Sequence, residues 1–184
     1  MYVDTFVNVC VLFRHAGQVR KGDKTPYVNH PLMVAALLAE CGVDDAEILA
    51  AAMLHDTLED TEATEADLIK LFGEGVTAIV KQVTDDRTQK PGMRKRAQVE
   101  HAPHLLPGAR LVKLADKICN IEDSIRGGGP WDPVRVQGYC VWGRRVCEGC
   151  RGVNAALDSR ADSLWDKSFV SPIDVAYQCK SMMN

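Results

Sequence analysis

The amino-acid sequence lacks a long hydrophobic run, an excess of positive charge and β-strand alternation, and each absence excludes a class of protein. No apolar run approaches the roughly 18 residues of a membrane-spanning helix. The N-terminal segment contains Asp4 and no basic stretch, so it does not resemble a secretory signal peptide. The formal net charge of −3 is opposite in sign to the basic excess of general nucleic-acid binders. These absences predict a cytoplasmic protein that binds neither a membrane nor nucleic acid.

The seven cysteines do not form a disulfide framework or a metal-binding pattern. An odd, scattered set in a chain without a signal peptide is typical of reduced thiols in the cytosol. Only Cys147 and Cys150 have a CxxC spacing, and neither a second ligand pair at zinc spacing nor a βαβ pattern accompanies them. We therefore interpret these two cysteines as small buried hydrophobic residues.

The composition is that of an ordinary globular protein, with 46% hydrophobic and 26% charged residues in a chain of 184. Such a chain fits one domain, which we expect to span residues 1–184. Apolar residues recur at helical spacing nearly throughout, so the predicted fold is an all-α, compact helical bundle of about eight or more helices. The predicted helices cover residues 5–20, 30–41, 46–58, 64–72, 76–83, 94–100, 109–125, 133–147 and 153–165.

Candidate chemistry is densest in residues 55–60 (HDTLED), at the end of the most apolar helix. Burying such groups without a partner costs several kcal/mol each, so a partner is expected, and a divalent cation suits a His-Asp pair. In a continuous helix Glu59 lies four residues after His55 and Asp60 four after Asp56, so both pairs share one side. The alternative is a solvated acidic helix end, which the helix dipole disfavours.

Two more residues extend the candidate metal site. His30 follows an extended Pro-Tyr segment at a helix start, where a lone histidine is usually a surface or capping residue. Asp116 lies among apolar residues of a strongly amphipathic helix. Together with His55 and Asp56 they form a mixed nitrogen and oxygen set, which suits manganese, iron or zinc better than calcium. Such a set leaves coordination positions for water and a phosphoryl oxygen, as metal-assisted hydrolysis requires.

The order His…His-Asp…Asp resembles the HD metal-dependent phosphohydrolases, and longer strings resemble the hydrolase domain of RelA/SpoT enzymes. The strings are residues 15–21 (HAGQVRK), 25–31 (TPYVNHP), 55–60 (HDTLED) and 113–120 (KLADKICN). The chain has no room for a synthetase domain. In this respect it resembles the stand-alone small alarmone hydrolases, including the metazoan SpoT homologues. We expect the motif-bearing core at about residues 12–145 and C-terminal helices in residues 146–184.

The resemblance implies a Mn²⁺-dependent 3′-pyrophosphohydrolase that converts ppGpp and pppGpp into GDP or GTP and pyrophosphate. It implies that His30, His55, Asp56 and Asp116 hold the metal and that Glu59 and Asp60 position and deprotonate the attacking water. The substrate-binding residues that it implies, some of them by approximate match only, are Arg20, Lys21, Tyr27, Lys90, Arg94, Lys95, Asn120 and Arg135.

Two other functions remain open at this level. One is a phosphatase acting on the 2′-phosphate of NADPH or on another ribose-phosphorylated nucleotide, which the metazoan relatives suggest. Pro91 stands where those relatives carry a lysine directed at the substrate phosphates, so substrate preference is the open point, with Lys90 as the possible substitute. The other is a catalytically idle alarmone-binding module, which has no need of two further carboxylates beside an anionic ligand. A helical scaffold protein would leave His30, His55 and Asp116 without a joint purpose.

Overall fold

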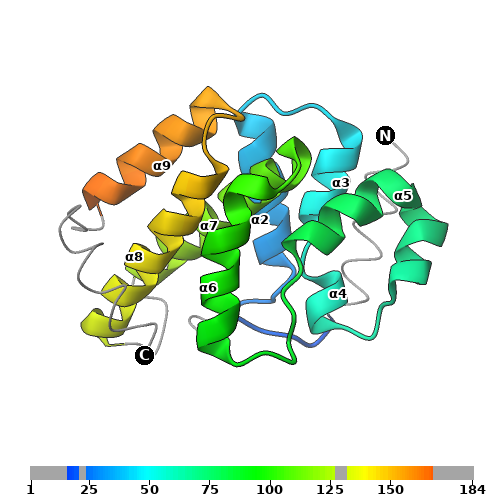
Figure 1. Ribbon diagram of the computed structural model, residues 1–184, viewed down its shortest axis with the longest axis horizontal. Helices are drawn as coiled ribbons and strands as arrows, with labels where there is room; N and C mark the ends of the chain where they lie inside the picture. Colours follow the sequence, from blue (N-terminus) through cyan, green and yellow to red (C-terminus); the bar gives the residue numbers. More distant parts are fainter. Residues whose placement is uncertain (1–15, 21–23, 127–131, 168–184) are drawn as a thin grey trace.

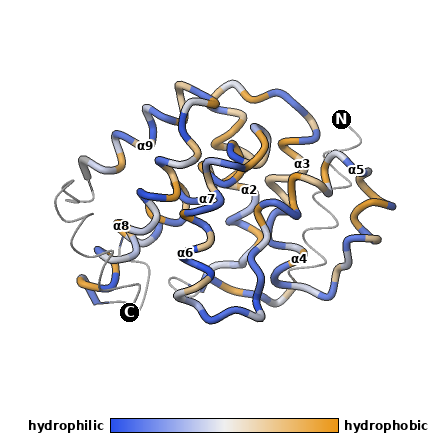
Figure 2. The backbone as a smooth tube through the Cα atoms, viewed as in Figure 1, coloured by the Kyte–Doolittle hydropathy of each residue, from blue (hydrophilic) through white to orange (hydrophobic). Residues whose placement is uncertain are grey.

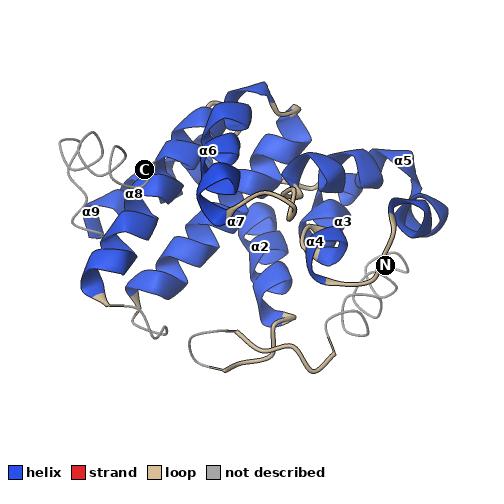
Figure 3. Ribbon diagram, turned by 60° about the horizontal axis from the view of Figure 1, so that its bottom comes forward, coloured by secondary structure: helices blue, strands red, loops and turns tan. Residues whose placement is uncertain are grey.

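The computed structural model describes residues 16–20, 24–126 and 132–167, and most of these residues are helical (Figures 1 and 3). Within them the only β-type pairing is an isolated antiparallel bridge between Val19 and Pro26. The helices are α2 (Asn29–Glu40), α3 (Ala46–Leu54), α4 (Thr57–Asp60), α5 (Glu65–Val83), α6 (Pro91–His101), η1 (Ala102–His104), α7 (Pro107–Ile125), α8 (Pro133–Cys150) and α9 (Ala155–Lys167). Seven have nine or more residues, while α4 and η1 are single turns. The all-α prediction is confirmed, and no described helix has the length and apolarity to cross a bilayer.

Helix α7 is the centre of the bundle. It contacts α2, α3, α5, α8, α9 and η1, and Figure 1 shows it beside α2, with α3–α5 on one side and α8 and α9 on the other. Its Val112, Leu114, Ile118 and Ile121 are completely buried, and such a side chain stabilises the fold by about 1.5–3 kcal/mol. Figure 2 shows hydrophobic residues alternating with hydrophilic ones along the helices. Because α7 contacts six other elements, its polar residues can lie close to side chains from several of them.

The predicted continuous helix over residues 46–58 is wrong, because α3 ends at Leu54 and α4 begins at Thr57. The ring Nδ1 of His55 lies 2.7 Å from the carbonyl oxygen of Ala52, which a continuous helix would pair with the backbone N–H of Asp56. Asp56 instead caps α4, where its carbonyl accepts the N–H of Asp60 at 2.8 Å. The i,i+4 relation expected from helical spacing therefore holds for Asp56 and Asp60, whereas the Glu59 N–H donates to the Asp56 carbonyl at 3.2 Å, an i,i+3 bond.

The first predicted helix is also wrong where it can be compared. Residues 16–20 form a turn and the isolated bridge, with Gly17 at a φ of +77° that favours glycine. Residues 5–15 of that prediction lie outside the described residues. The predicted break near residue 73 is confirmed, since Gly73 has a φ of +85° inside α5.

Cys147 and Cys150 lie on the buried face of α8 as free thiols. Burial raises the pKa of the Cys150 thiol to about 11, so it stays protonated at neutral pH. Neither belongs to a metal-binding group among the described residues. Their interpretation as hydrophobic core residues agrees with this burial.

Candidate active site

Four side chains from three separate parts of the chain converge at the N-terminal end of α2. His30 comes from the first turn of α2, His55 and Asp56 from the α3–α4 turn, and Asp116 from the middle of α7. One ligand atom each from His30, His55 and Asp56 lies within 4.8 Å of the others. Asp116 Oδ1 lies 3.1 Å from His30 Nε2 and 3.7 Å from His55 Nε2. The sequence-predicted metal residues are thus brought together.

The donor chemistry of this cluster fits a bound cation. A carbonyl oxygen can only accept, so the contact with Ala52 places a proton on His55 Nδ1 and turns Nε2 toward the cluster. That Nε2 is buried without a hydrogen-bond partner, although Asp56 Oδ2 lies 3.0 Å away. Burial alone would lower the pKa of His55, but the Asp56 and Asp116 carboxylates raise it to about 10. The cluster therefore favours a positive charge at this point, which a proton or a divalent metal ion can supply.

Polar neighbours hold both carboxylates in place. Lys117 Nζ lies 3.0 Å from Asp116 Oδ2, and Asn120 Nδ2 donates to Asp116 Oδ1 at 2.5 Å. The Tyr27 hydroxyl donates to Asp56 Oδ2 at 2.5 Å. Burial, reinforced by the Asp56 carboxylate, raises the pKa of Tyr27, so the phenol remains the donor. Such outer contacts orient metal-binding side chains and fix which oxygen faces the ion.

Arg20 extends this network on the side of Tyr27. Its Nη2 donates to Asn120 Oδ1 at 3.0 Å and to Asp123 Oδ2 at 2.7 Å, and its guanidinium lies 5.8 Å from the centre of the Tyr27 ring. Tyr27 and Asn120, two of the sequence-predicted substrate residues, therefore contact carboxylates of the metal cluster directly, and Arg20 contacts Tyr27 and Asn120 in turn. Lys21 lies outside the described residues.

Glu59 and Asp60 lie at the end of α4 and are bound by cations rather than by His55. Arg87 donates from Nε to Glu59 Oε1 at 3.3 Å and from Nη2 to Asp60 Oδ1. Arg94 Nη1 also lies 3.5 Å from Glu59 Oε1. Of these two arginines, only Arg94 is among the substrate-binding residues that the family resemblance implies.

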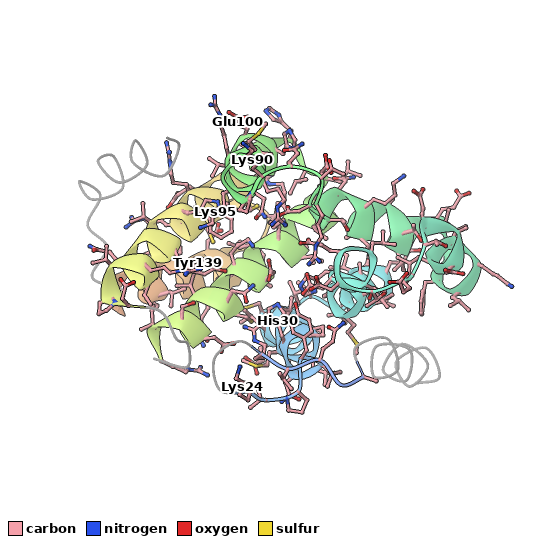
Figure 4. All side chains as sticks on the ribbon, turned by 90° about the horizontal axis from the view of Figure 1, so that it is seen from below. Lys24, His30, Lys90, Lys95, Glu100 and Tyr139 are labelled. Carbon is pink, nitrogen blue, oxygen red and sulfur yellow. The ribbon has the colours of Figure 1, made fainter. Side chains whose placement is uncertain are left out.

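Two lysines, Lys95 and Lys117, contact an aromatic pair on α8, Tyr139 and Trp142. Lys95 Nζ lies 5.6 Å from the Tyr139 ring centre and 5.1 Å from that of Trp142, whose Nε1 donates to the Lys95 carbonyl at 2.9 Å. Burial and the nearby charges of Arg135 and Lys117 lower the pKa of Lys95. Figure 4 shows His30, Lys95 and Tyr139 on three different elements. Lys90 is exposed at the start of α6, and the structure does not bring it into the metal cluster.

The structure adds residues that the sequence does not predict for the site: Arg87, Lys117, Tyr139, Trp142 and Gln18, whose Nε2 donates to the Asp60 carbonyl at 3.0 Å. Lys117 stands inside the quoted 113–120 string and could have been chosen because a lysine on an otherwise buried helix needs a partner. Arg87 lies in a polar loop, and nothing local indicates that it reaches residues nearly thirty positions earlier.

Comparisons with known proteins agree with this geometry. An HD-domain family profile matches residues 10–127. The chain is 46% identical to guanosine-3′,5′-bis(diphosphate) 3′-pyrophosphohydrolase MESH1 of Xenopus tropicalis, over 83% of this chain and 87% of that protein. It is 45% identical to human MESH1, over 83% and 87% of the two chains. A solved structure described as a metazoan ortholog of SpoT that hydrolyzes ppGpp superimposes with a TM-score of 0.87 at 37% identity, covering 91% of this chain and 96% of that one.

HD-domain hydrolases bind a divalent metal ion, and the buried His-His-Asp cluster of this chain is the group suited to it. The family profile covers well over half of the sequence, and the identity to the MESH1 proteins extends over most of both chains. The protein belongs to the HD-domain family and, within it, to the MESH1 proteins.

Proposed function

We propose that this protein is a Mn²⁺-dependent guanosine-3′,5′-bis(diphosphate) 3′-pyrophosphohydrolase that converts ppGpp or pppGpp into GDP or GTP and pyrophosphate. The observation that carries the proposal is the buried His55 Nε2, which has no hydrogen-bond partner and is surrounded by His30, Asp56 and Asp116. The names of the MESH1 relatives supply the substrate class. Free thiols among the described cysteines suit the reducing cytoplasm predicted from the sequence.

His30, His55, Asp56 and Asp116 would hold the metal ion. When bound, a divalent ion polarises a phosphoryl oxygen and lowers the pKa of a coordinated water. Nitrogen and carboxylate ligands suit manganese among the divalent ions that this chemistry can use. Lys117 pairs with Asp116 Oδ2, so that Oδ1, which also accepts from Asn120, faces the two histidines.

Glu59 and Asp60 would orient the attacking water and accept its proton. The water oxygen forms a bond to the phosphorus attached to the ribose 3′-oxygen, and the bond from that phosphorus to the 3′-oxygen breaks. Pyrophosphate leaves, and the 3′-oxygen takes up one proton, equal to the one that water lost, to become the 3′-hydroxyl. Arg87 pairs with both carboxylates and Arg94 pairs with Glu59, at the end of α4.

The substrate would lie between the Arg20–Tyr27 side and the α6–α8 side of the cluster. Arg20 offers a planar guanidinium for stacking or two-point contact, and Asn120 a neutral amide for the nucleoside. Lys95 and Arg135 would supply positive charge for the phosphates; burial, together with the nearby charges of Arg135 and Lys117, lowers the pKa of Lys95. Lys21, Lys90 and Arg94 complete the proposed set of cations.

The test is pyrophosphate release from ppGpp by the purified protein in the presence of Mn²⁺. We expect release from the wild type and its loss in Asp56→Ala and after chelation of the metal. Glu65→Gln is the matched control, because it removes an acidic charge on α5 that is bound only to the exposed Lys81. Pyrophosphate release that survives Asp56→Ala would refute the assignment of the metal site.

The rival functions give different products in the same assay. Inorganic phosphate released from NADPH at a rate comparable with pyrophosphate from ppGpp would favour a phosphatase of ribose-phosphorylated nucleotides. Tight binding of ppGpp without any product, whichever divalent ion is added, would favour an alarmone-binding module.

A further inference from the structure

Arg87 contacts both proposed catalytic carboxylates, and neither the family resemblance nor the sequence assigned it a role. Its guanidinium binds Glu59 through Nε at 3.3 Å and Asp60 through Nη2. Glu59 and Asp60 are adjacent in the sequence, and two carboxylates held near one cation repel each other. One guanidinium that binds both groups offsets this repulsion and fixes their relative orientation.

The loop that carries Arg87 is itself held by side-chain hydrogen bonds. Asp86 Oδ1 accepts from the Thr88 backbone N–H at 2.9 Å and from its hydroxyl at 2.7 Å, which closes a tight turn around Arg87. Asp85 Oδ2 accepts from Gln98 Nε2 at 2.6 Å, which ties the loop to α6. The loop thus presents Arg87 in a defined place instead of leaving it on an unsupported segment.

The same loop reaches Glu59 through its backbone. The Asp85 N–H donates to Glu59 Oε2 at 3.3 Å, while Arg87 takes Oε1. The two oxygens of one carboxylate are therefore held by neighbouring residues of a single loop. Since the Arg87 side chain is 55% exposed, it contributes little to packing, and its ion pairs are its main contacts.

We propose that Arg87 is a positioning residue for the reaction: it holds Glu59 and Asp60 in the orientation from which they act on the attacking water. The proposal rests on the pyrophosphohydrolase function proposed above. In this proposal the loop between α5 and α6 aligns Glu59 and Asp60. Substrate binding stays with the cations of the proposed substrate site, such as Arg20 and Lys95. A misplacement of about 1 Å in such groups can lower a rate by about 100-fold.

The test compares steady-state kinetics of pyrophosphate release from ppGpp at saturating Mn²⁺ for Arg87→Met, Arg87→Lys and the control Arg96→Met. Arg96 is an exposed α6 arginine paired with Glu100, so its replacement makes the same charge change away from the site. We expect kcat of Arg87→Met to fall by about 10- to 100-fold with little change in KM. Arg87→Lys should recover part of the loss, and Arg96→Met should resemble the wild type.

The outcomes separate this proposal from the function on which it rests. An active wild type with an unchanged or raised kcat in Arg87→Met would overturn the positioning role alone. A rise in KM at unchanged kcat would assign Arg87 to substrate binding and also overturn it. A wild type that releases no pyrophosphate from ppGpp would overturn the proposed function and the role of Arg87 with it.

Discussion

Lys117 is a buried ammonium whose removal should lower the stability of the metal-free protein far more than removal of an exposed lysine. It is 6% exposed, lies 3.0 Å from Asp116 Oδ2, and stands 4.7 Å from the centre of the Trp142 ring. Burial alone would lower its pKa, but the Asp116 carboxylate outweighs burial and raises it, so the group is charged. The substitution Lys117→Met keeps most of the side-chain volume and removes only the charge.

The magnitude follows from the distance and the burial. Two unit charges 3.0 Å apart attract each other by about 5 kcal/mol at an effective dielectric constant of about 20. Breaking a buried pair costs about 3–5 kcal/mol, because the remaining charge stays buried. Asp116 keeps His30 and Asn120 as partners, so we expect the lower end, about 3 kcal/mol. At 2–4 °C for each kcal/mol, the melting temperature should fall by about 6–12 °C.

Lys81→Met is the matched control. Lys81 Nζ lies 2.7 Å from Glu65 Oε1, but the two side chains are 50% and 48% exposed. An exposed pair of this kind contributes about 0–1 kcal/mol, so the change in unfolding free energy should stay below about 1 kcal/mol.

The assay is urea and thermal unfolding of both variants in the presence of a chelator, repeated with Mn²⁺. A cation bound beside Asp116 would replace part of the lost positive charge, so Mn²⁺ should raise the melting temperature of Lys117→Met more than that of the wild type. If Lys117→Met loses no more stability than Lys81→Met under chelation, the reasoning from burial is refuted.

Two further substitutions test packing and substrate contacts. Gly149→Ala would place a Cβ 2.7 Å from Ala102 Cβ and 3.0 Å from Pro103 Cδ, neither of which can rotate away. Overpacking costs about 1–3 kcal/mol and alanine returns up to about 1 kcal/mol of helix propensity, so the urea midpoint should fall by the equivalent of about 1 kcal/mol; an unchanged midpoint would contradict the close approach. Trp142→Phe removes the indole hydrogen bond to the Lys95 carbonyl and weakens the cation–π contact with its ammonium. We expect a rise in KM for ppGpp of about two- to fivefold at similar kcat, and an unchanged KM would show that Trp142 does not hold Lys95 for the substrate.

Local patterns predicted the helices well where tertiary contacts did not compete with them. The apolar spacing over residues 109–125 predicted a helix that the structure extends by only two residues, to Pro107. The run over residues 46–58 predicted one helix, whereas a side-chain contact of His55 with the Ala52 carbonyl ends α3 at Leu54. Helical periodicity does not predict such a contact. The contact depends on the orientation of the His55 imidazole, which residues distant in the sequence determine.

The candidate site likewise contains residues that the sequence predicts and residues whose partners only the fold reveals. The residue types for metal binding stand in recognisable strings, so His30, His55, Asp56 and Asp116 could be selected before any geometry was known. Lys117 and Arg87 could not be assigned partners, because an ion pair depends on which helices meet. Arg87 reaches α4 because α5, which ends at Val83 shortly before Arg87, packs against α4.

The sequence by itself determined the all-α class, the positions of most helices and the residues with metal-binding chemistry, because these follow from local periodicity and residue type. Only the tertiary structure decided which atoms meet: a buried His55 Nε2 among three other ligating groups, a lysine paired with Asp116 Oδ2, and one arginine that binds both Glu59 and Asp60. The physical reason is that the strength and direction of these charge interactions depend on separation and burial, which arise when distant segments pack against α7.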